Sequence, residues 1–370
     1  MKLLTLLSAI AGVQAVLFTP PKSFYKTTWT SEELVDESRL DPWNNTHPRR
    51  LMISRFKPIP APLCLKTCRV PYMPPVIADI EDRILQAFFA DAGWKAGTLS
   101  SLEVEVCCKT IPVPGLNSLF PKVFLATGLN TTRLTYTATA QHLASVGYEV
   151  IVMDHPYETD VVQFPNGELI FGGNIVGQRN NSVKLAYGLT IRSADTSFVM
   201  DKFKMRKTTF IGQSYGGAAA ADILVRDKRV AGGVNMDGAM YGPGAENGVD
   251  RPFMIMGSDG HNSSIESEPT WTPFVKAMED KHPNVFFREF SMEDSTHGSW
   301  TDSSLICDIV PGLKENEALA DFCGGKATGD RAMEIMKHYL KQFIEFTLHH
   351  APEGDLSHPN PKYPDMTIIT

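Results

Sequence analysis

The sequence predicts an α/β fold in which a mainly parallel sheet carries helices on both faces. From Phe120 to Leu348, short apolar or β-branched runs alternate with longer segments of helical periodicity. This alternation favours a parallel sheet, because each connecting helix must pack on one of its faces. The chain has 370 residues, 43% of them hydrophobic, which suffices for one large core. We therefore expect a single domain over residues 77–350, with no internal repeat.

Residues 1–15 have the pattern of a secretory signal peptide. Lys2 supplies the positively charged n-region, and Leu3–Val13 form the apolar h-region. Val13-Gln14-Ala15 has the small residues of a cleavage site. The apolar stretch is too short to cross a bilayer, which takes about 20 apolar residues. A buried N-terminal helix or strand is the alternative. We expect a secreted, extracellular mature chain.

The overall charge argues against some classes of partner. The formal net charge is −7, which is unfavourable for binding nucleic acid or an anionic membrane. No later segment has the length and apolar character of a membrane span. The sequence therefore predicts neither a nucleic-acid partner nor an integral membrane segment.

The first part of the mature chain is predicted to be an extended arm. Residues 16–76 are rich in proline and lack a hydrophobic period, so we expect them to wrap on the domain. Residues 79–92 then have helical spacing, with Ile84 and Phe88 on the same side. Residues 103–108 alternate in polarity and predict an edge strand.

Six cysteines, an even number, fit three disulfides in an oxidising compartment. Cys307 and Cys323 bracket a 15-residue segment and are expected to pair with each other. The other four would staple the arm to the strand after it, and they are Cys64, Cys68, Cys107 and Cys108. A metal cluster of these four is the alternative, which adjacent cysteines disfavour because they lack the usual zinc-ligand spacing.

Four Asn-x-Ser/Thr sequons begin at Asn44, Asn130, Asn180 and Asn262. On a secreted chain we expect most of these asparagines to be glycosylated surface positions.

The remaining elements follow in order along the domain. Strands are predicted at 120–126, 149–153, 207–211, 230–236, 253–256 and 285–290. Helices are predicted at 134–146, 182–203, 218–225, 269–278 and 332–348. Residues 160–172 predict a hairpin that turns at Pro165-Asn166-Gly167. Residues 351–370 are expected to form a loose tail.

The segment Gly212-Gln213-Ser214-Tyr215-Gly216-Gly217 carries the strongest functional signal. It joins a predicted strand to an alanine-rich helix, so Ser214 would lie in a sharp turn between them. Glycine two residues before and two after the serine lets the neighbouring backbone approach closely. Such an elbow exposes the hydroxyl and directs a helix N-terminus at developing negative charge. A chance Gly-x-Ser-x-Gly is the alternative, which the flanking elements disfavour. We predict that Ser214 is a nucleophile.

A serine nucleophile needs a base, and in this architecture the base follows the serine along the chain. The candidates are His261, His282 and His297. His297 lies in the loop after the last predicted strand, where such a histidine is expected, so we predict His297 as the base.

The carboxylate that orients the base has two candidates. Asp237 ends the strand that follows the elbow helix, and Asp259 ends the next strand. Position alone favours Asp259, and both residues precede a glycine, as turn aspartates often do. The residues by themselves leave both open.

An oxyanion hole should combine two backbone N–H groups. Tyr215 supplies one, and Leu129, in the turn Thr127-Gly128-Leu129 after an early strand, is the natural second donor. Asn130 heads a sequon beside this turn, so either the sequon is unused or its side chain points outward.

Together these motifs resemble the platelet-activating factor acetylhydrolase-like branch of the α/β-hydrolases. The resemblance rests on the Ser214 motif, Asp237, Ser295-Thr296-His297 and Thr127-Gly128-Leu129, and it runs from about residue 121 to residue 348. The N-terminal arm shows no match.

The resemblance implies an α/β-hydrolase fold and places the acid after the strand that follows the elbow helix, which selects Asp237. Where the family usually has His-Gly-Leu, this chain has Thr127-Gly128-Leu129; the backbone donor survives the change, but the inference of substrate is weakened. The helix before the elbow contains Arg192 and Asp195, which are similar to the family's pattern and are expected to form an i,i+3 ion pair.

The sequence thus predicts a secreted serine ester hydrolase that works through an acyl-enzyme and requires no cofactor or metal. The resemblance implies a small-molecule or lipid ester with a short acyl group, such as an acetylated phospholipid. An acidic secreted enzyme could equally act on plant-wall or polymer esters. An acyltransferase with the same triad, or an α/β-hydrolase-like protein that only binds, is the alternative.

Overall fold

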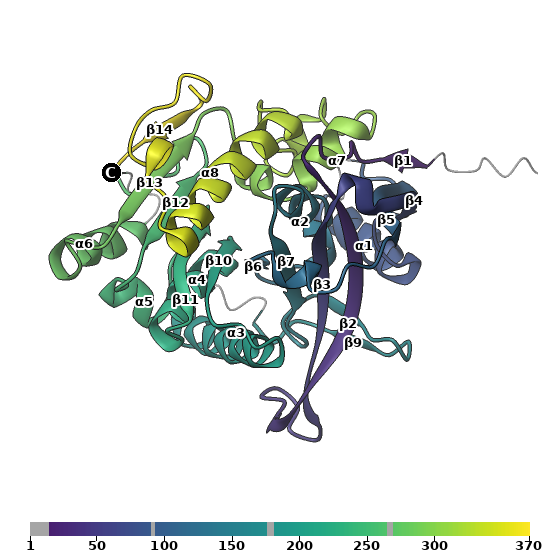
Figure 1. Ribbon diagram of the computed structural model, residues 1–370, viewed down its shortest axis with the longest axis horizontal. Helices are drawn as coiled ribbons and strands as arrows, with labels where there is room; N and C mark the ends of the chain where they lie inside the picture. Colours follow the sequence, from purple (N-terminus) through teal and green to yellow (C-terminus); the bar gives the residue numbers. More distant parts are fainter. Residues whose placement is uncertain (1–14, 90–92, 176–180, 265–268) are drawn as a thin grey trace, which may run out of the picture.

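The computed structural model describes residues 15–89, 93–175, 181–264 and 269–370. At its centre is a nine-stranded sheet in the order β14-β13-β12-β11-β10-β6-β7-β3-β2 (Figure 1). Its strands are β2 (Tyr25–Leu40), β3 (Pro48–Pro60), β6 (Lys122–Ala126), β7 (Glu149–Asp154), β10 (Thr208–Gln213), β11 (Val230–Met236), β12 (Phe253–Gly257), β13 (Phe287–Met292) and β14 (Met366–Ile368).

The sheet is mixed rather than mainly parallel. The neighbours from β7 through β6, β10, β11 and β12 to β13 pair in parallel. At the edges, β3 pairs antiparallel with β7, β2 with β3, and β14 with β13. The alternation of strands and helices predicted the parallel centre, because helical crossovers join those strands. The antiparallel edges come from the two ends of the chain.

The N-terminal segment, expected to wrap on the domain as an arm, contributes strands to the sheet itself. β2 and β3 form a long hairpin, the purple ribbon that extends beyond the sheet in Figure 1. Met52–Phe56 of β3 pairs with Val150–Asp154 of β7. Pro58 and Pro60 lie beyond this pairing. β7 makes no hydrogen bonds there, so the missing N–H groups of the two prolines cost no pairing with β7. The prolines that suggested an arm therefore occupy positions a strand tolerates.

A small sheet in the order β1-β5-β4 is stapled by disulfides. Its strands are β1 (Val16–Leu17), β5 (Leu102–Thr110) and β4 (Cys64–Pro71). Cys64 is bonded to Cys107, and Cys68 to Cys108, so the expected link between the N-terminal segment and the following strand is present. β5, predicted as an edge strand, lies in the middle of this sheet.

Helices cover both faces of the large sheet, as predicted. They are α1 (Pro75–Phe88), α2 (Thr137–Ala144), α3 (Ser182–Lys202), α4 (Tyr215–Arg226), α5 (Gly242–Asn247), α6 (Trp271–Lys281), α7 (Ser303–Ile309) and α8 (Gly329–His349). Strand β6 shows the two faces: Val123 and Leu125 pack with α2 and α8, whereas Phe124 and Ala126 pack with α3 and α4. This is the two-residue period of a strand buried on both sides.

Shorter elements complete the fold. β8 (Val161–Gln163) and β9 (Leu169–Phe171) form the predicted hairpin. The 3-10 turns are η1 (Ala61–Leu63), η2 (Leu99–Ser101), η3 (Leu116–Ser118), η4 (Arg133–Tyr136), η5 (His297–Trp300), η6 (Glu317–Leu319) and η7 (Gly354–Leu356). The tail, expected to be loose, ends in β14, and its Tyr363 and Met366 are buried. Burial of these apolar side chains holds the tail on the sheet.

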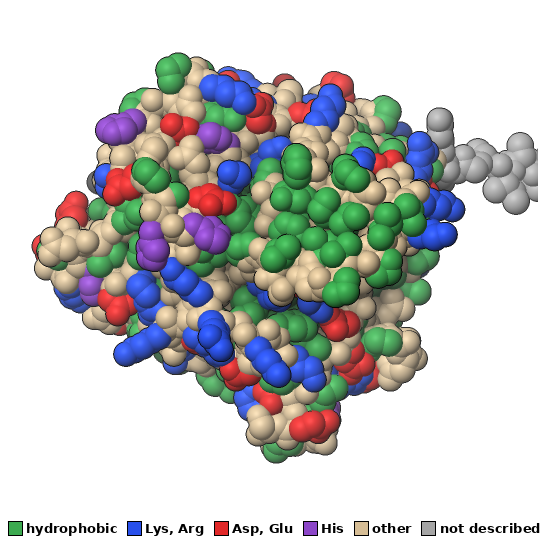
Figure 2. All heavy atoms as spheres, viewed as in Figure 1, with side chains coloured by type: hydrophobic (Ala, Val, Ile, Leu, Met, Phe, Trp, Pro, Cys, Tyr) green, Lys and Arg blue, Asp and Glu red, His purple; other side chains and the backbone are tan. Residues whose placement is uncertain are grey.

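Exposed hydrophobic side chains gather on one face of the molecule. Figure 2 shows them over the region where β2, β3 and β4 lie in Figure 1. Phe24, just before β2, and Leu65 of β4 are among the large apolar side chains left exposed.

Within the described residues, no helix combines the length and apolar character that crossing a bilayer requires. The predicted signal peptide lies, except for Ala15, outside the described residues, as do Asn180 and residues 90–92 of the predicted first helix.

Candidate active site

Ser214 occupies a strained turn between β10 and α4. Its φ of 56° and ψ of −126° lie outside the regions that side chains ordinarily favour. The Ser214 N–H donates to the Met236 carbonyl at 2.8 Å, and the Ser214 carbonyl accepts from Gly217 at 2.8 Å. A Cβ on Gly212 would come within 1.8 Å of the Gly216 carbonyl oxygen, so the close backbone approach requires glycine. The predicted strand–turn–helix elbow is therefore present.

Four of the predicted site residues line one cavity of about 560 Å³. They are Leu129, Ser214, Tyr215 and His297. The cavity lies where parallel strands β6 and β10 end, which is the usual place for a ligand site in an open α/β sheet.

The predicted acid Asp237 lies behind His297. It follows β11, has a φ of 59°, and is 4% exposed. His297 Nδ1 donates to Asp237 Oδ2 at 2.6 Å, and the Ser258 N–H donates to Oδ1 at 2.7 Å. Burial alone would raise the pKa of Asp237, but the hydrogen bonds from His261 and His297 hold it well below its ordinary value. Asp237 is thus an ionised hydrogen-bond acceptor.

The other candidate residues lie apart from this contact. Asp259 Oδ2 accepts from the Asp294 N–H at 3.1 Å and so steadies the loop that precedes His297. His282 Nε2 contacts the Asn247 carbonyl at 3.1 Å. The structure therefore brings Asp237, and not Asp259, to His297.

His261, considered above only as a base, contacts the same carboxylate from the other side. Its Nδ1 lies 2.7 Å from Asp237 Oδ1, and its ring stacks on Trp271 with centroids 4.2 Å apart. This position was missed because it depends on two neighbouring strands: His261 follows β12, which pairs with β11 ahead of Asp237. The order of the strands was the signal that could have found it.

Gln213 links His297 to the Thr127–Leu129 turn. Its Nε2 lies 3.0 Å from His297 Nε2, and its Oε1 accepts from the Tyr136 hydroxyl at 2.7 Å. That hydroxyl accepts in turn from the Gly128 N–H at 2.9 Å. With Nδ1 donating to Asp237 and Nε2 accepting from Gln213, the imidazole is the neutral tautomer whose Nε2 carries the lone pair. The contacts fix which nitrogen can act as a base.

Arg192 holds the Thr127–Leu129 turn from behind. Its buried guanidinium donates to the Thr127 carbonyl at 2.5 Å and to the Gly128 carbonyl at 2.9 Å. It also forms an ion pair with Glu158 and lies 4.7 Å above the ring of Tyr215. One side chain thus contacts the segments that carry both predicted oxyanion donors.

The prediction that Arg192 and Asp195 form an ion pair with each other is wrong. Asp195 instead bonds Arg49 at 2.7 Å, and it also contacts Arg39 and His155. The side chains of Arg192 and Asp195, both on α3, are buried. Each therefore pairs with a charged residue of a neighbouring element rather than with the other across the helix surface.

We expect Arg192→Lys to lower kcat by about 100-fold, because a single ammonium cannot bridge two carbonyls and Glu158, and small misplacements of catalytic groups cost that much. Arg49→Lys is the matched control, since Arg49 is equally buried but bonds Asp41 and Asp195. It should lower the melting temperature and preserve kcat. Equal losses of kcat in both variants would contradict a specific role for Arg192.

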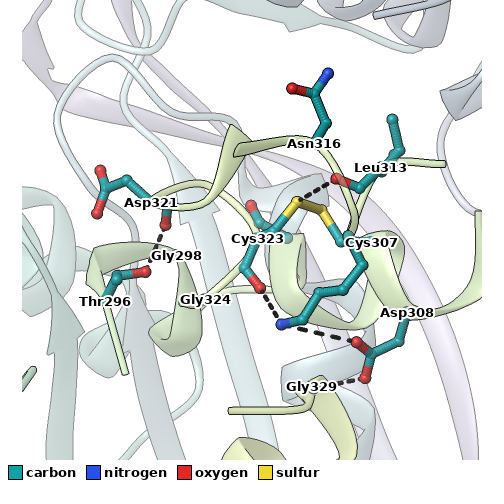
Figure 3. The surroundings of a disulfide bond; sticks show 12 residues. Thr296, Gly298, Cys307, Asp308, Leu313, Asn316, Asp321, Cys323, Gly324 and Gly329 are labelled. Atoms are coloured by element: carbon teal, nitrogen blue, oxygen red, sulfur yellow. Dashed lines mark hydrogen bonds and ion pairs between the residues drawn. A yellow bond between two sulfur atoms is a disulfide. The ribbon is translucent and has the colours of Figure 1, made fainter. Parts of the chain in front are cut away.

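The third disulfide, between Cys307 and Cys323, lies beside the His297 loop, as Figure 3 shows. The carbonyl of Asp321, within the disulfide-closed segment, accepts from Thr296 Oγ1 at 2.6 Å and from the Gly298 N–H at 3.1 Å. These two residues flank His297. The cross-link therefore stabilises the segment on which the His297 loop rests.

Asn130 lies at the cavity. It has a φ of 55° and contributes to the cavity lining next to Leu129. A glycan on its sequon would crowd the same opening. The described residues contain no group of three or more His, Cys, Asp and Glu side chains placed to hold a metal ion.

Comparison with known proteins gives two similarities, although no family model matches the chain. The chain is 35% identical to a probable 1-alkyl-2-acetylglycerophosphocholine esterase from Arthroderma benhamiae, over 95% of this chain and 94% of that protein. It also superposes on the structure of a ferulic acid esterase from Streptomyces cinnamoneus with a TM-score of 0.77. That match covers 96% of this chain and all of the other, and at 23% identity it shows the fold alone.

Proposed function

The chain belongs to the family of the probable 1-alkyl-2-acetylglycerophosphocholine esterase, a family of carboxylic ester hydrolases, and from this premise we propose that it is a secreted serine esterase for short-acyl esters. The observation that supports the proposal most is the set of contacts around Ser214. A serine on a strained elbow shares a cavity with a histidine whose Nδ1 is held by a buried aspartate. This is the arrangement that activates a serine hydroxyl.

In the first step, Ser214 Oγ attacks the ester carbonyl while His297 Nε2 accepts its proton. Asp237 keeps the imidazole in the required tautomer and stabilises the imidazolium that forms. Gln213, which contacts Nε2 at 3.0 Å, must release that nitrogen when the serine approaches. His261 and the Ser258 N–H hold the other carboxylate oxygen, so the carboxylate cannot rotate away.

The negative charge on the tetrahedral oxygen would be met by the N–H groups of Leu129 and Tyr215. Both residues line the cavity beside Ser214, and Tyr215 begins α4, so the positive end of the helix dipole adds to the effect. One such donor is worth about 100-fold or more in rate. Arg192 supports both donors through the contacts described above.

His297 then gives its proton to the leaving alcohol, which completes acylation. In deacylation, His297 accepts a proton from a water that attacks the acyl-enzyme, and it returns that proton to Ser214 Oγ as the carboxylic acid is released. No residue beyond these is needed for the proton transfers, and we propose no cofactor.

The short acyl group is proposed from the family rather than from the cavity. An acetyl group fills only a small part of about 560 Å³, so the leaving alcohol would occupy most of the space. Apolar side chains of α1, among them Ile84, Leu85 and Phe88, line that space and suit an alcohol with apolar parts.

Secretion is proposed from three features: the signal-like N-terminus, the three disulfides and the sequons. Glycosylation of the sequons follows from the same proposal.

A series of p-nitrophenyl esters from acetate to palmitate tests the proposed reaction, with the secreted protein assayed beside Ser214→Ala. We expect serine-dependent kcat/KM to be highest for acetate and to fall as the acyl chain lengthens. Activity that rises with length would replace the short-acyl proposal by a lipase-like one. Absence of serine-dependent activity on every ester would remove the proposed function, and transfer of the acetyl group to added alcohols in place of water would indicate an acyltransferase.

A further inference from the structure

The side chain of Gln213 lies between His297 and the Thr127–Leu129 turn. Gln213 ends β10, is 2% exposed, and lines the cavity together with His297 and Ser214. A Cβ on Gly128 would lie 3.1 Å from Gln213 Oε1 and 3.4 Å from the Ser214 Cβ, so the amide and the serine lie against the same glycine. The amide of Gln213 is therefore close to the groups that react in the proposed function.

Hydrogen-bond counting determines which end of this amide faces His297. The Tyr136 hydroxyl accepts from the Gly128 N–H at 2.9 Å, and its own single hydrogen is directed to Gln213 Oε1, 2.7 Å away. Burial raises the pKa of Tyr136, so the hydroxyl keeps that hydrogen. The NH₂ end of Gln213 therefore faces His297, and its Nε2 lies 3.0 Å from His297 Nε2.

The proposed reaction removes the acceptor that this NH₂ group has in the free protein. When His297 takes the proton of Ser214, its Nε2 becomes an N–H group and can no longer accept a hydrogen bond. A buried amide N–H without an acceptor is unfavourable. A new acceptor that arrives within about 3 Å of the amide of Gln213 would therefore be stabilised by it.

The oxygen of the leaving alcohol is such an acceptor. His297 Nε2–H must donate to this oxygen when the tetrahedral intermediate collapses, so the oxygen lies within about 3 Å of Nε2 and beside the amide. Ser214 Oγ is by then bonded to the carbonyl carbon and gains no negative charge. The leaving oxygen becomes negative as its bond to carbon breaks, and hydrogen bonds to charged groups are about twice as strong as neutral ones.

We propose that Gln213 is a further catalytic residue, which donates a hydrogen bond from Nε2 to the leaving oxygen. As the intermediate collapses, the bond between the carbonyl carbon and that oxygen breaks and the proton on His297 Nε2 passes to the oxygen. Gln213 transfers no proton. The inference rests on the proposed function, because it assigns a role in that reaction. The reaction should depend most on Gln213 when the leaving atom is a strong hydrogen-bond acceptor.

A change of one atom in the substrate tests this role. Benzyl acetate and S-benzyl thioacetate have the same acyl group and similar shapes, but the leaving atom is oxygen in the first and sulfur, a weak acceptor, in the second. Gln213→Met keeps the length of the side chain and lacks the N–H groups. We expect its kcat/KM to fall by about 100-fold on the ester, the effect of removing one donor to a developing charge, and by no more than a few-fold on the thioester.

The ratio of the two kcat/KM values is the quantity to compare. Both values come from one preparation, so a partly unfolded variant lowers them by the same factor and leaves the ratio unchanged. Gln213→Leu also lacks the N–H groups and should shift the ratio in the same direction. Gln141→Met is the matched control, because Gln141 is a buried glutamine outside the cavity lining and donates to Thr27 Oγ1 at 2.9 Å. It should leave the ratio at the wild-type value.

Tyr136→Phe separates a contact with the leaving oxygen from support of the Thr127–Leu129 turn. It removes the hydroxyl that joins Gln213 Oε1 to the Gly128 N–H, and it keeps the NH₂ group of Gln213. We expect it to lower kcat/KM by the same factor on the ester and on the thioester, because it weakens the turn for both.

An equal loss on the two substrates in Gln213→Met would overturn the role, since it would show that the amide only supports the site. A shift of the ratio in Tyr136→Phe as large as that in Gln213→Met would overturn it as well. The wild type beside Ser214→Ala distinguishes this failure from that of the proposed function. Cleavage of neither substrate in a serine-dependent way would remove the esterase proposal and the role of Gln213 together, whereas serine-dependent cleavage with an unshifted ratio would remove the role of Gln213 alone.

Discussion

Ser214→Ala is expected to abolish ester hydrolysis and to leave the fold intact. Loss of a serine nucleophile costs about 10⁶ in kcat, and the small remaining rate comes from the oxyanion donors and from binding. The turn should survive, because Ser214 is held there through its backbone N–H and carbonyl, which alanine keeps. The measurement is kcat on p-nitrophenyl acetate, with circular dichroism and the melting temperature as checks of folding.

Ser145→Ala is a suitable control for this experiment. Ser145 is buried and its hydroxyl donates to the His142 carbonyl, away from the cavity lining. This variant should keep its kcat even if it is slightly less stable. Hydrolysis retained by Ser214→Ala would show that another group attacks the ester.

Asp237→Asn is expected to lower kcat by about 10⁴. The carboxylate receives Nδ1–H of His297 on one oxygen and contacts His261 on the other. An amide has a single acceptor oxygen, so one imidazole would face an NH₂ group and adopt the opposite tautomer. If that imidazole is His297, its Nε2 becomes protonated and cannot accept the proton of Ser214.

Asp259→Asn is the matched control for this prediction, because Asp259 bonds only the Asp294 N–H among the contacts described for its side chain. Its kcat should stay within a few-fold of the wild type. The reverse result, a large loss in Asp259→Asn and a small one in Asp237→Asn, would transfer the role of the acid to Asp259.

Asp237 should also contribute to stability in a pH-dependent way. Its pKa is lowered in the folded protein, so its ionised form favours the folded state at pH values above the unfolded pKa of about 4. That contribution is lost as the pH falls below this value. The melting temperatures of wild type and Asp237→Asn should therefore converge in acid.

Local sequence determined the parts of this protein that depend on neighbours along the chain. The elbow at Ser214 could be predicted because a buried strand, two spaced glycines and an alanine-rich helix leave few conformations for the turn. The position of His297 followed from the order of the strands. The parallel centre of the sheet followed from strand–helix alternation.

Tertiary structure decided what depends on residues far apart in the chain. The residues alone left Asp237 and Asp259 open, and only the pairing of β11 with β12 shows which carboxylate reaches His297. The partners of Arg192, expected along its own helix, lie in the Thr127–Leu129 turn and at Glu158. Buried charges pair with whatever element the fold packs against them, and sequence spacing does not reveal that element.

The arrangement of the two ends of the chain and of the cavity wall likewise could not be predicted from local sequence. The prolines of β3 suggested an arm, whereas the strand is defined by its pairing with β7, about 100 residues later. Residues 79–92 were predicted as a helix with Ile84 and Phe88 on one side, and only the packing of the fold places these side chains at the cavity beside Ser214. The sequence by itself thus determined the turn at Ser214 and the class of fold through local propensity and period. The carboxylate that reaches His297, the support of the Thr127–Leu129 turn and the shape of the cavity were decided by long-range packing, because each requires side chains from separate elements to meet.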